Sequence, residues 1–193
     1  MNKITLIITT ALFALLSLQN AEANAQFVRI DVEEIDNGGI VPGKTFRVFA
    51  VFENSGDILD AVYGEASAPL KITSTKPFYQ HPKGGPLSTD IQRYDMSVNP
   101  ELAFDSWVTI GIDSQPVGDQ GPISTVESAD QPWINSFASG SSTDGQDFMM
   151  DDFTGGAWYV LNGTPNGLPD AENSRVLFMQ LTTAGEISGG IEI

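Results

Sequence analysis

The chain has 193 residues and no cysteine, and its 25 acidic and 9 basic side chains give it a formal net charge of −16. A negative field of this size repels nucleic acids and anionic membrane surfaces, so we expect neither as a partner. The lack of cysteine excludes disulfides, thiolate zinc sites, iron–sulfur clusters, cysteine nucleophiles and a lipidated N-terminal cysteine.

The N-terminal segment has the pattern of a secretory signal peptide. A basic start at Lys3 precedes residues 4–18, which are apolar and carry no charge. This run is shorter than the roughly 20 residues that a membrane-spanning helix needs. Ala23 and Ala25 then form the A-x-A pattern that a signal peptidase recognises. We therefore predict cleavage after Ala25, which leaves residues 26–193 as a periplasmic or secreted protein of a Gram-negative bacterium with no membrane span.

The remainder of the chain has the pattern of a single all-β domain. Glycine (19 residues) and proline (11 residues) interrupt the apolar runs at short intervals, as expected for many short strands. Residues 26–34 alternate between apolar and polar side chains, whereas residues 45–53 are apolar and β-branched on both faces, which is typical of a central strand. The predicted strands are residues 26–34, 45–53, 59–63, 70–74, 106–112, 157–161, 175–183 and 186–193.

The segments between these strands complete the predicted fold. The short connection 183–186 predicts that the last two strands form a hairpin. Ser124 and Glu127 have the spacing of a capping box, which predicts one or two helical turns. Residues 76–90 and 137–152 are expected to be long surface loops. The predicted fold class is all-β, a two-layer antiparallel β-sandwich with long loops, for which immunoglobulin-like and jelly-roll topologies both stay open.

With the strands placed, five segments of the chain show a resemblance to known modules. They are residues 46–52 (FRVFAVF), 61–64 (AVYG), 77–80 (PFYQ), 105–111 (DSWVTIG) and 175–177 (RVL). On these segments the chain resembles a family of uncharacterised secreted β-rich modules, which occur in extracellular and cell-surface proteins of aquatic bacteria. The resemblance implies an extracellular setting and a β-rich fold, and it carries over no functional residue.

The sequence contains no recognisable catalytic motif. His81 is the only histidine, and it lies in a loop rich in proline and glycine, whereas a catalytic base needs a rigidly positioned ring. Asp105 and Ser106 resemble part of an esterase block but lack its glycine and open a predicted strand. A pair of carboxylates would suffice for glycoside hydrolysis, but the 25 acidic residues do not single out one pair. We therefore predict no catalytic residue.

One loop has the spacing of a calcium site. Oxygen-bearing side chains occupy positions one, three, five, nine and eleven of the segment 162–173, with a glycine at position six, as in loops that surround Ca²⁺ with alternate side chains. The twelfth position is an asparagine, where such a loop normally has a bidentate glutamate. The predicted ligands of this weak site are Asn162, Thr164, Asn166, Asp170 and Glu172. The alternative is a plain loop between two strands.

Two aromatic residues are candidates for glycan binding. Trp107 and Trp158 fall inside predicted strands, where core packing is the expected role. Tyr79 and Trp133 fall in predicted loops, where a ring can offer a flat face to a sugar. Packing in the core is the alternative role for these two residues as well.

These observations leave three functions from different classes. The first is a secreted structural or interaction module at the cell surface or in the extracellular matrix, stabilised by Ca²⁺ if the loop binds it. The second is a glycan-binding module that uses Tyr79 or Trp133, and the third is a carboxylate-dependent hydrolase. An extracellular protein or a glycan is therefore the expected partner, and the sequence does not predict the oligomeric state.

Overall fold

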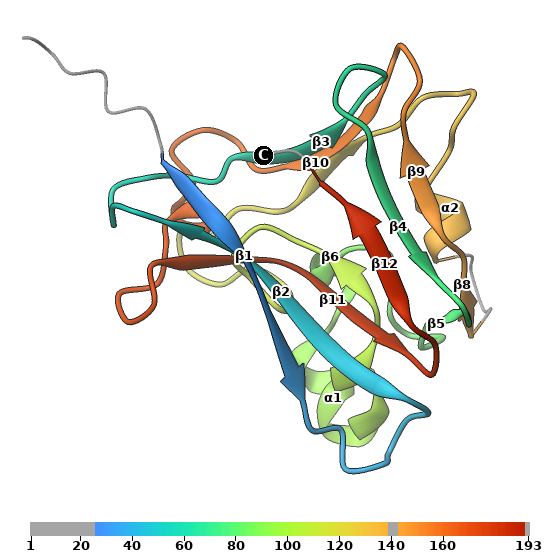
Figure 1. The fold of residues 1–193 in the computed structure, drawn as a ribbon. Coiled ribbons are helices and arrows are strands. Elements are labelled where there is room, and N and C mark those ends of the chain that lie inside the picture. The colour runs from blue at the N-terminus through green and yellow to red at the C-terminus, as the bar shows by residue number, and fades with distance from the viewer. Residues whose placement is uncertain (1–25, 139–142, 192–193) are drawn as a thin grey trace, which may run out of the picture.

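The computed structural model describes residues 26–138 and 143–191, which form a β-rich domain with antiparallel sheets and few helical turns (Figure 1). The signal peptide predicted for residues 1–25 lies outside the described residues. The strands are β1 (Phe27–Ile35), β2 (Lys44–Phe52), β3 (Ala61–Gly64), β4 (Leu70–Ser74), β5 (Phe78–Tyr79), β6 (Trp107–Val108), β7 (Ser124–Val126), β8 (Asp144–Gly145), β9 (Phe148–Met150), β10 (Gly156–Tyr159), β11 (Arg175–Thr183) and β12 (Ile187–Gly190). The helices are α1 (Arg93–Val98) and α2 (Ile134–Phe137), with 3-10 turns η1 (Ser88–Asp90), η2 (Pro100–Phe104) and η3 (Pro165–Gly167).

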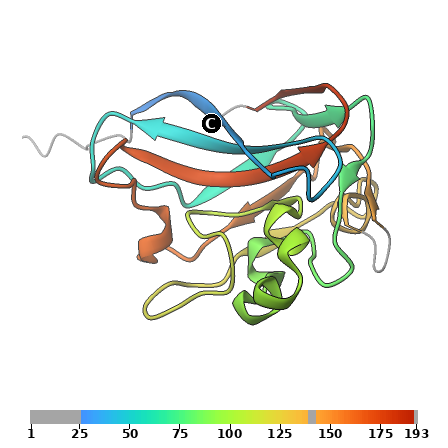
Figure 2. The same ribbon diagram turned by 90° about the horizontal axis from the view of Figure 1, so that it is seen from below.

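The strands form three sheets. The largest has the order β1-β2-β11-β5-β8, and β6 also pairs with β11. The two smaller sheets have the orders β3-β10-β7 and β12-β4-β9. Seen from below, β2 and β11 cross the molecule as one layer, and α1 lies beneath them (Figure 2). The prediction of an all-β sandwich is confirmed.

The core lies between the sheets and is rich in aromatic side chains. Trp133 packs against Phe148 and Trp158, with ring centroids 5.5 and 5.8 Å apart. A second, smaller cluster of Ile91, Leu102 and Trp107 lies apart from this main core. Because β2 and β11 bury residues on both faces, they act as the central strands that their apolar sequences predict.

The predicted C-terminal hairpin is wrong. The strands β11 and β12 do follow each other closely in the chain, but β12 pairs with β4, and β11 pairs with β2, β5 and β6. A tight connection brings two strands near each other without making them neighbours in one sheet. Here the chain leaves the largest sheet after Thr183 and enters another sheet at Ile187.

Three other local predictions also differ from the structure. Residues 124–126 form strand β7 instead of helical turns, and the side chain of Glu127 accepts a hydrogen bond from the N–H of Ile134 at the start of α2. The predicted loop 137–152 contains β8 and β9 within its described part. The predicted strand 106–112 is regular only at β6, and beyond it Gly111 has a φ of +69°, which belongs to the left-handed region.

None of the helices in the described part of the chain is long and apolar enough to cross a membrane.

Candidate functional site

A polar cleft of about 440 Å³ lies beside the loop that contains the only histidine. Three separate segments of the chain form its walls: the loop 80–92, the residue Gln115 and the residue Ala138 at the end of α2. The lining residues are Gln80, His81, Gly84, Gly85, Pro86, Thr89, Asp90, Gln92, Gln115 and Ala138.

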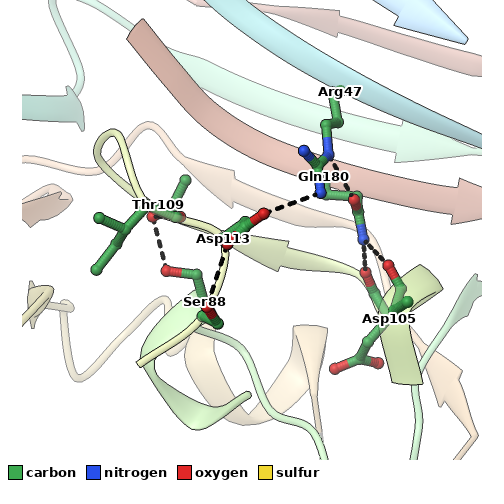
Figure 3. Close-up of polar contacts among 9 residues, drawn as sticks. Arg47, Ser88, Asp105, Thr109, Asp113 and Gln180 are labelled. Atoms are coloured by element: carbon green, nitrogen blue, oxygen red, sulfur yellow. Dashed lines mark hydrogen bonds and ion pairs between the residues drawn. The ribbon is translucent and has the colours of Figure 1, made fainter. Parts of the chain in front are cut away.

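The segment that follows the cleft loop is fixed beneath the largest sheet by a polar network (Figure 3). Gln180 on β11 donates from its amide Nε2 to the backbone oxygens of Ala103 and Asp105, at 3.0 and 2.8 Å. Its Oε1 accepts a hydrogen bond from Arg47 Nε at 2.9 Å, and Arg47 also reaches Asp113. Gln180 is buried, so these bonds satisfy an amide that would otherwise be costly inside the protein.

The side chain of Asp105 points away from Gln180 (Figure 3) and anchors the cleft loop from behind. Its Oδ1 accepts a hydrogen bond from the backbone N–H of His81 at 2.6 Å, and its Oδ2 accepts one from Gly85 N–H at 3.2 Å. The carboxyl group is fully buried, and this burial raises its pKa to about 8, although backbone N–H groups of the loop lower it in part. Asp105 thus holds both ends of the segment from His81 to Gly85.

Two glycines allow the loop to pass close to two carboxyl groups. A β-carbon on Gly84 would lie 1.9 Å from Asp105 Oδ2, and one on Gly85 would lie 2.4 Å from Asp90 Oδ2. Any larger residue would therefore force these carboxyl groups to move. The pair Gly84-Gly85 is required by this close approach, which brings Asp90 and Asp105 to the two sides of one short backbone segment.

Among the lining residues of the cleft, Gln80 has a buried polar atom without a hydrogen-bond partner in the described part of the chain. It is 2% exposed, and its Nε2 donates to Ser106 O at 2.9 Å. Its Oε1 is buried and has no hydrogen-bond partner among the described residues. A buried amide oxygen without a donor is costly, so its presence at the cleft needs an explanation.

Burial shifts the pKa values of the two ionisable groups in the cleft lining, His81 and Asp90. Burial lowers the pKa of the His81 imidazole, and its Nδ1 accepts a hydrogen bond from Lys83 N–H at 3.1 Å. This leaves a neutral ring that carries its proton on Nε2. Burial also raises the pKa of Asp90, although the N–H of Leu87 lowers it in part. Among the lining residues there is no lysine or arginine, so the cleft has little attraction for an anion.

The chemistry of the cleft is therefore that of binding by hydrogen bonds. Its amide and hydroxyl side chains come from Gln80, Thr89, Gln92 and Gln115, and each of these groups can both donate and accept. The imidazole of His81 has no serine or threonine hydroxyl among its hydrogen-bond partners in the described residues. No group of three or more His, Asp or Glu side chains suited to a metal ion occurs in the described ranges.

The two aromatic candidates for glycan binding have different positions. Trp133 is 1% exposed, and its indole Nε1 donates to Val126 O at 3.2 Å. It has no free face on which a sugar could stack in this structure, so the glycan-binding role predicted for it is not supported. Tyr79 on β5 is half-buried next to Gln80 and outside the cleft lining. Its burial and the nearby charges of Asp105 and Glu101 raise its pKa to about 12.

The loop predicted to bind calcium uses two of its polar side chains in the protein itself. Asn166 is 5% exposed and forms two hydrogen bonds with the backbone of Gly121, through Oδ1 at 3.0 Å and through Nδ2 at 2.8 Å. Asp170 Oδ1 accepts the N–H groups of Glu172 and Asn173, and its Oδ2 lies 3.6 Å from Arg175 Nε.

The remaining predicted calcium ligands to place are Asn162, Thr164 and Glu172. Thr164 donates its hydroxyl to Leu161 O, while the side chains of Asn162 and Glu172 are exposed. The calcium site stays a prediction, and the described contacts give the loop a structural role without a metal.

We expect Asn166→Ala to lower the free energy of unfolding by about 1–3 kcal/mol, because it leaves both polar groups of Gly121 without their partner. The loss should be equal in EDTA and in millimolar Ca²⁺. Thermal unfolding of the wild type and the variant in both buffers measures it. Asn162→Ala is the matched control, since this exposed amide forms no described hydrogen bond, and it should leave the melting temperature unchanged. A loss that occurs only in Ca²⁺ would show that the loop binds the metal.

The cleft could not be recognised from the sequence, because its residues come from three distant segments. The signals that bear on it are the pair Gly84-Gly85 and the aspartate at position 105. Each is common in loops, and only the fold shows that the two lie in contact.

No family model, no curated protein and no solved structure matches the chain. The resemblance to secreted β-rich modules therefore stays a prediction.

Proposed function

We propose that the protein is an exported interaction module, and that it binds hydroxyl-rich ligands of the glycan class in the cleft beside His81. The observation that carries this proposal is the polar cleft lined by amides and hydroxyls, and one of its lining residues, Gln80, has a buried Oε1 without a hydrogen-bond partner among the described residues. A sugar hydroxyl can donate to one of these groups and accept from another, so it matches side chains that do both.

The charge of the site favours a neutral ligand. The net charge of −16 and the carboxyl of Asp90 disfavour anionic ligands, and the lining contains no cation that would offset them. A neutral polysaccharide carries many hydroxyls and no charge. Export, which the N-terminal segment predicts, would place the protein where such polymers occur.

We expect the double variant Gln92→Ala/Gln115→Ala to bind its polysaccharide about tenfold or more weakly than the wild type. Each substitution removes one amide from the cleft, and a hydrogen bond contributes roughly 0.5–1.5 kcal/mol. Both side chains are exposed, so the fold should tolerate their loss.

The measurement is affinity electrophoresis on a panel of neutral and acidic polysaccharides, followed by calorimetry with the best ligand. Asn162→Ala is the control, because it removes an exposed amide outside the cleft lining. Retention of the wild type on a neutral polymer, with weaker retention of the double variant alone, supports the proposal. The absence of retention on every polymer, or equal retention of all three proteins, would refute it.

A further inference from the structure

The outer edge of β1 is an unpaired strand edge. This nine-residue strand pairs with β2 along one side and ends the largest sheet, and no described strand pairs with its other side. Figure 1 shows β1 at the border of the molecule. An exposed edge of this length offers a row of backbone N–H and C=O groups to another strand.

One face of β1 is apolar although it is largely in contact with solvent. Phe27 is 38% exposed and Val32 is 62% exposed, with Ile30 between them on the same side of the strand. A β-bulge at Val28, between Phe27 and Arg29, places that residue outside the alternation. Ile30 and Val32 also line an apolar groove between the largest sheet and β12. The edge therefore combines unpaired backbone groups with apolar side chains that a second strand would cover.

We propose that two copies of this chain associate through antiparallel pairing of their β1 edges, with the two-fold axis at Ile30. Each β1 strand would then extend the sheet of the other copy. A symmetric interface of this kind requires that the same surface be complementary to itself.

The axis must pass through a residue and not between two residues. In an antiparallel strand, alternate residues direct their N–H and C=O groups to the same edge. The residues whose N–H and C=O groups point outward in one copy therefore meet those of the other copy only if paired positions are both even-numbered or both odd-numbered. With the axis at Ile30, position 29 faces position 31 of the other copy, and both lie in the regular part of the strand that follows the bulge at Val28.

The charges on β1 select this register among those that meet this condition. With the axis at Ile30, Arg29 faces Asp31 of the other copy twice, and no like charges face each other. An axis at position 29 pairs two arginines. An axis at position 31 pairs two aspartates, and the Arg29 that it also places opposite Glu33 meets a carboxylate already paired with Arg175. An axis at position 32 or beyond places acidic residues opposite each other, whereas an axis at position 28 pairs no charges at all. Opposite charges across strands are stabilising, and like charges are destabilising.

The remaining charges of β1 are already neutralised within one copy. Glu33 forms an ion pair with Arg175 at 2.8 Å, and Glu34 forms one with Lys44 at 2.8 Å. Arg29 contacts Asp31 of its own strand at 2.7 Å, so the dimer would join two such pairs into a network of four charges. The self-association of an acidic protein is therefore favoured at this edge, where its local charge is balanced.

Sedimentation velocity of the exported protein, purified after expression of the full chain, tests this association. The wild type should show a concentration-dependent dimer. Arg29→Asp and Asp31→Arg should each shift it to the monomer, since each places like charges opposite one another. The double variant Arg29→Asp/Asp31→Arg should restore the dimer, because it exchanges the charges and keeps their pairing. Circular dichroism checks that every variant is folded.

The register is tested by cross-linking, for which the cysteine-free chain is well suited. Paired Cα atoms lie about 4.5–5.5 Å apart across antiparallel strands, within the reach of a disulfide. Ile30→Cys should form a covalent dimer under mild oxidation. Val32→Cys should not, because the two copies of position 32 are four residues out of register. A wild type that is monomeric at every concentration, or equal cross-linking of both variants, would overturn the proposal.

Discussion

Replacement of Trp133 by alanine is expected to lower the free energy of unfolding by about 3–5 kcal/mol, the usual cost of removing a large aromatic side chain from a core. The indole is almost fully buried between Phe148 and Trp158, and its N–H donates to Val126 O. The variant therefore loses packing on two aromatic rings and the hydrogen bond from the indole to Val126 O. Chemical denaturation with urea measures the change.

This result decides how any effect of Trp133 on binding should be interpreted. Trp133→Phe keeps most of the packing and loses the hydrogen bond, so we expect a folded protein that binds any polysaccharide retained by the wild type equally well. Trp133→Ala should reduce binding only to the extent that the protein is unfolded. A stable Trp133→Ala variant that binds no ligand would contradict the structure and restore this residue as a stacking surface.

The pH dependence of stability is the second large effect, and Asp105 is its expected cause. Its pKa is about 8 in the folded protein and near 3.9 in an unfolded chain. Between these values the folded state binds a proton that the unfolded state releases. The contribution of Asp105 is therefore fully present below about pH 4 and is lost as the pH rises toward about 8. The expected loss is on the order of a few kcal/mol.

The variant Asp105→Asn distinguishes the effect of this titration on stability from the effect of the hydrogen bonds that Asp105 accepts. An amide has one oxygen to offer, whereas Asp105 accepts from both His81 N–H and Gly85 N–H. We therefore expect the variant to be less stable than the wild type by about 1–3 kcal/mol at pH 4 to 5. The difference should shrink or reverse toward pH 8, because the variant does not titrate.

Urea denaturation of Asp105→Asn and of Asp119→Asn from pH 4 to 8 measures these curves. Asp119 is exposed and forms no described hydrogen bond, so its variant should follow the wild type. The difference between the two curves isolates Asp105 from the titrations of His81 and Asp90. A constant difference across the range would show that Asp105 keeps its charge in the folded protein.

The sequence predicts the strands well where a strand is long and lies in the centre of a sheet. Strands β4 and β11 have the predicted bounds, and β2 differs from its prediction by one residue at each end. Their apolar and β-branched residues favour extended structure before any tertiary contact forms. The short strands β5, β8 and β9 have too few residues to show an alternation, so the sequence predicts loops where they occur.

Pairing and burial depend on partners that the local sequence does not contain. The hairpin between β11 and β12 was wrong because the partner of β12 is β4, more than a hundred residues earlier in the chain. Trp133 lies outside the predicted strands, yet it is a core residue, since the burial of a loop residue is decided by the elements that pack over it. The cleft has the same origin, because Gln80 and Gln115 become neighbours only after folding.

Titration of the ¹⁵N-labelled protein with a neutral polysaccharide, or with oligosaccharides made from it, tests the proposed binding site most directly. Chemical-shift changes report which backbone amides sense the ligand. We predict that the largest changes occur at residues 80–92 and at Gln115, with little change at Asn162 or around Trp133. Changes centred elsewhere, or none at saturating ligand, would contradict the assignment of function to the cleft beside His81.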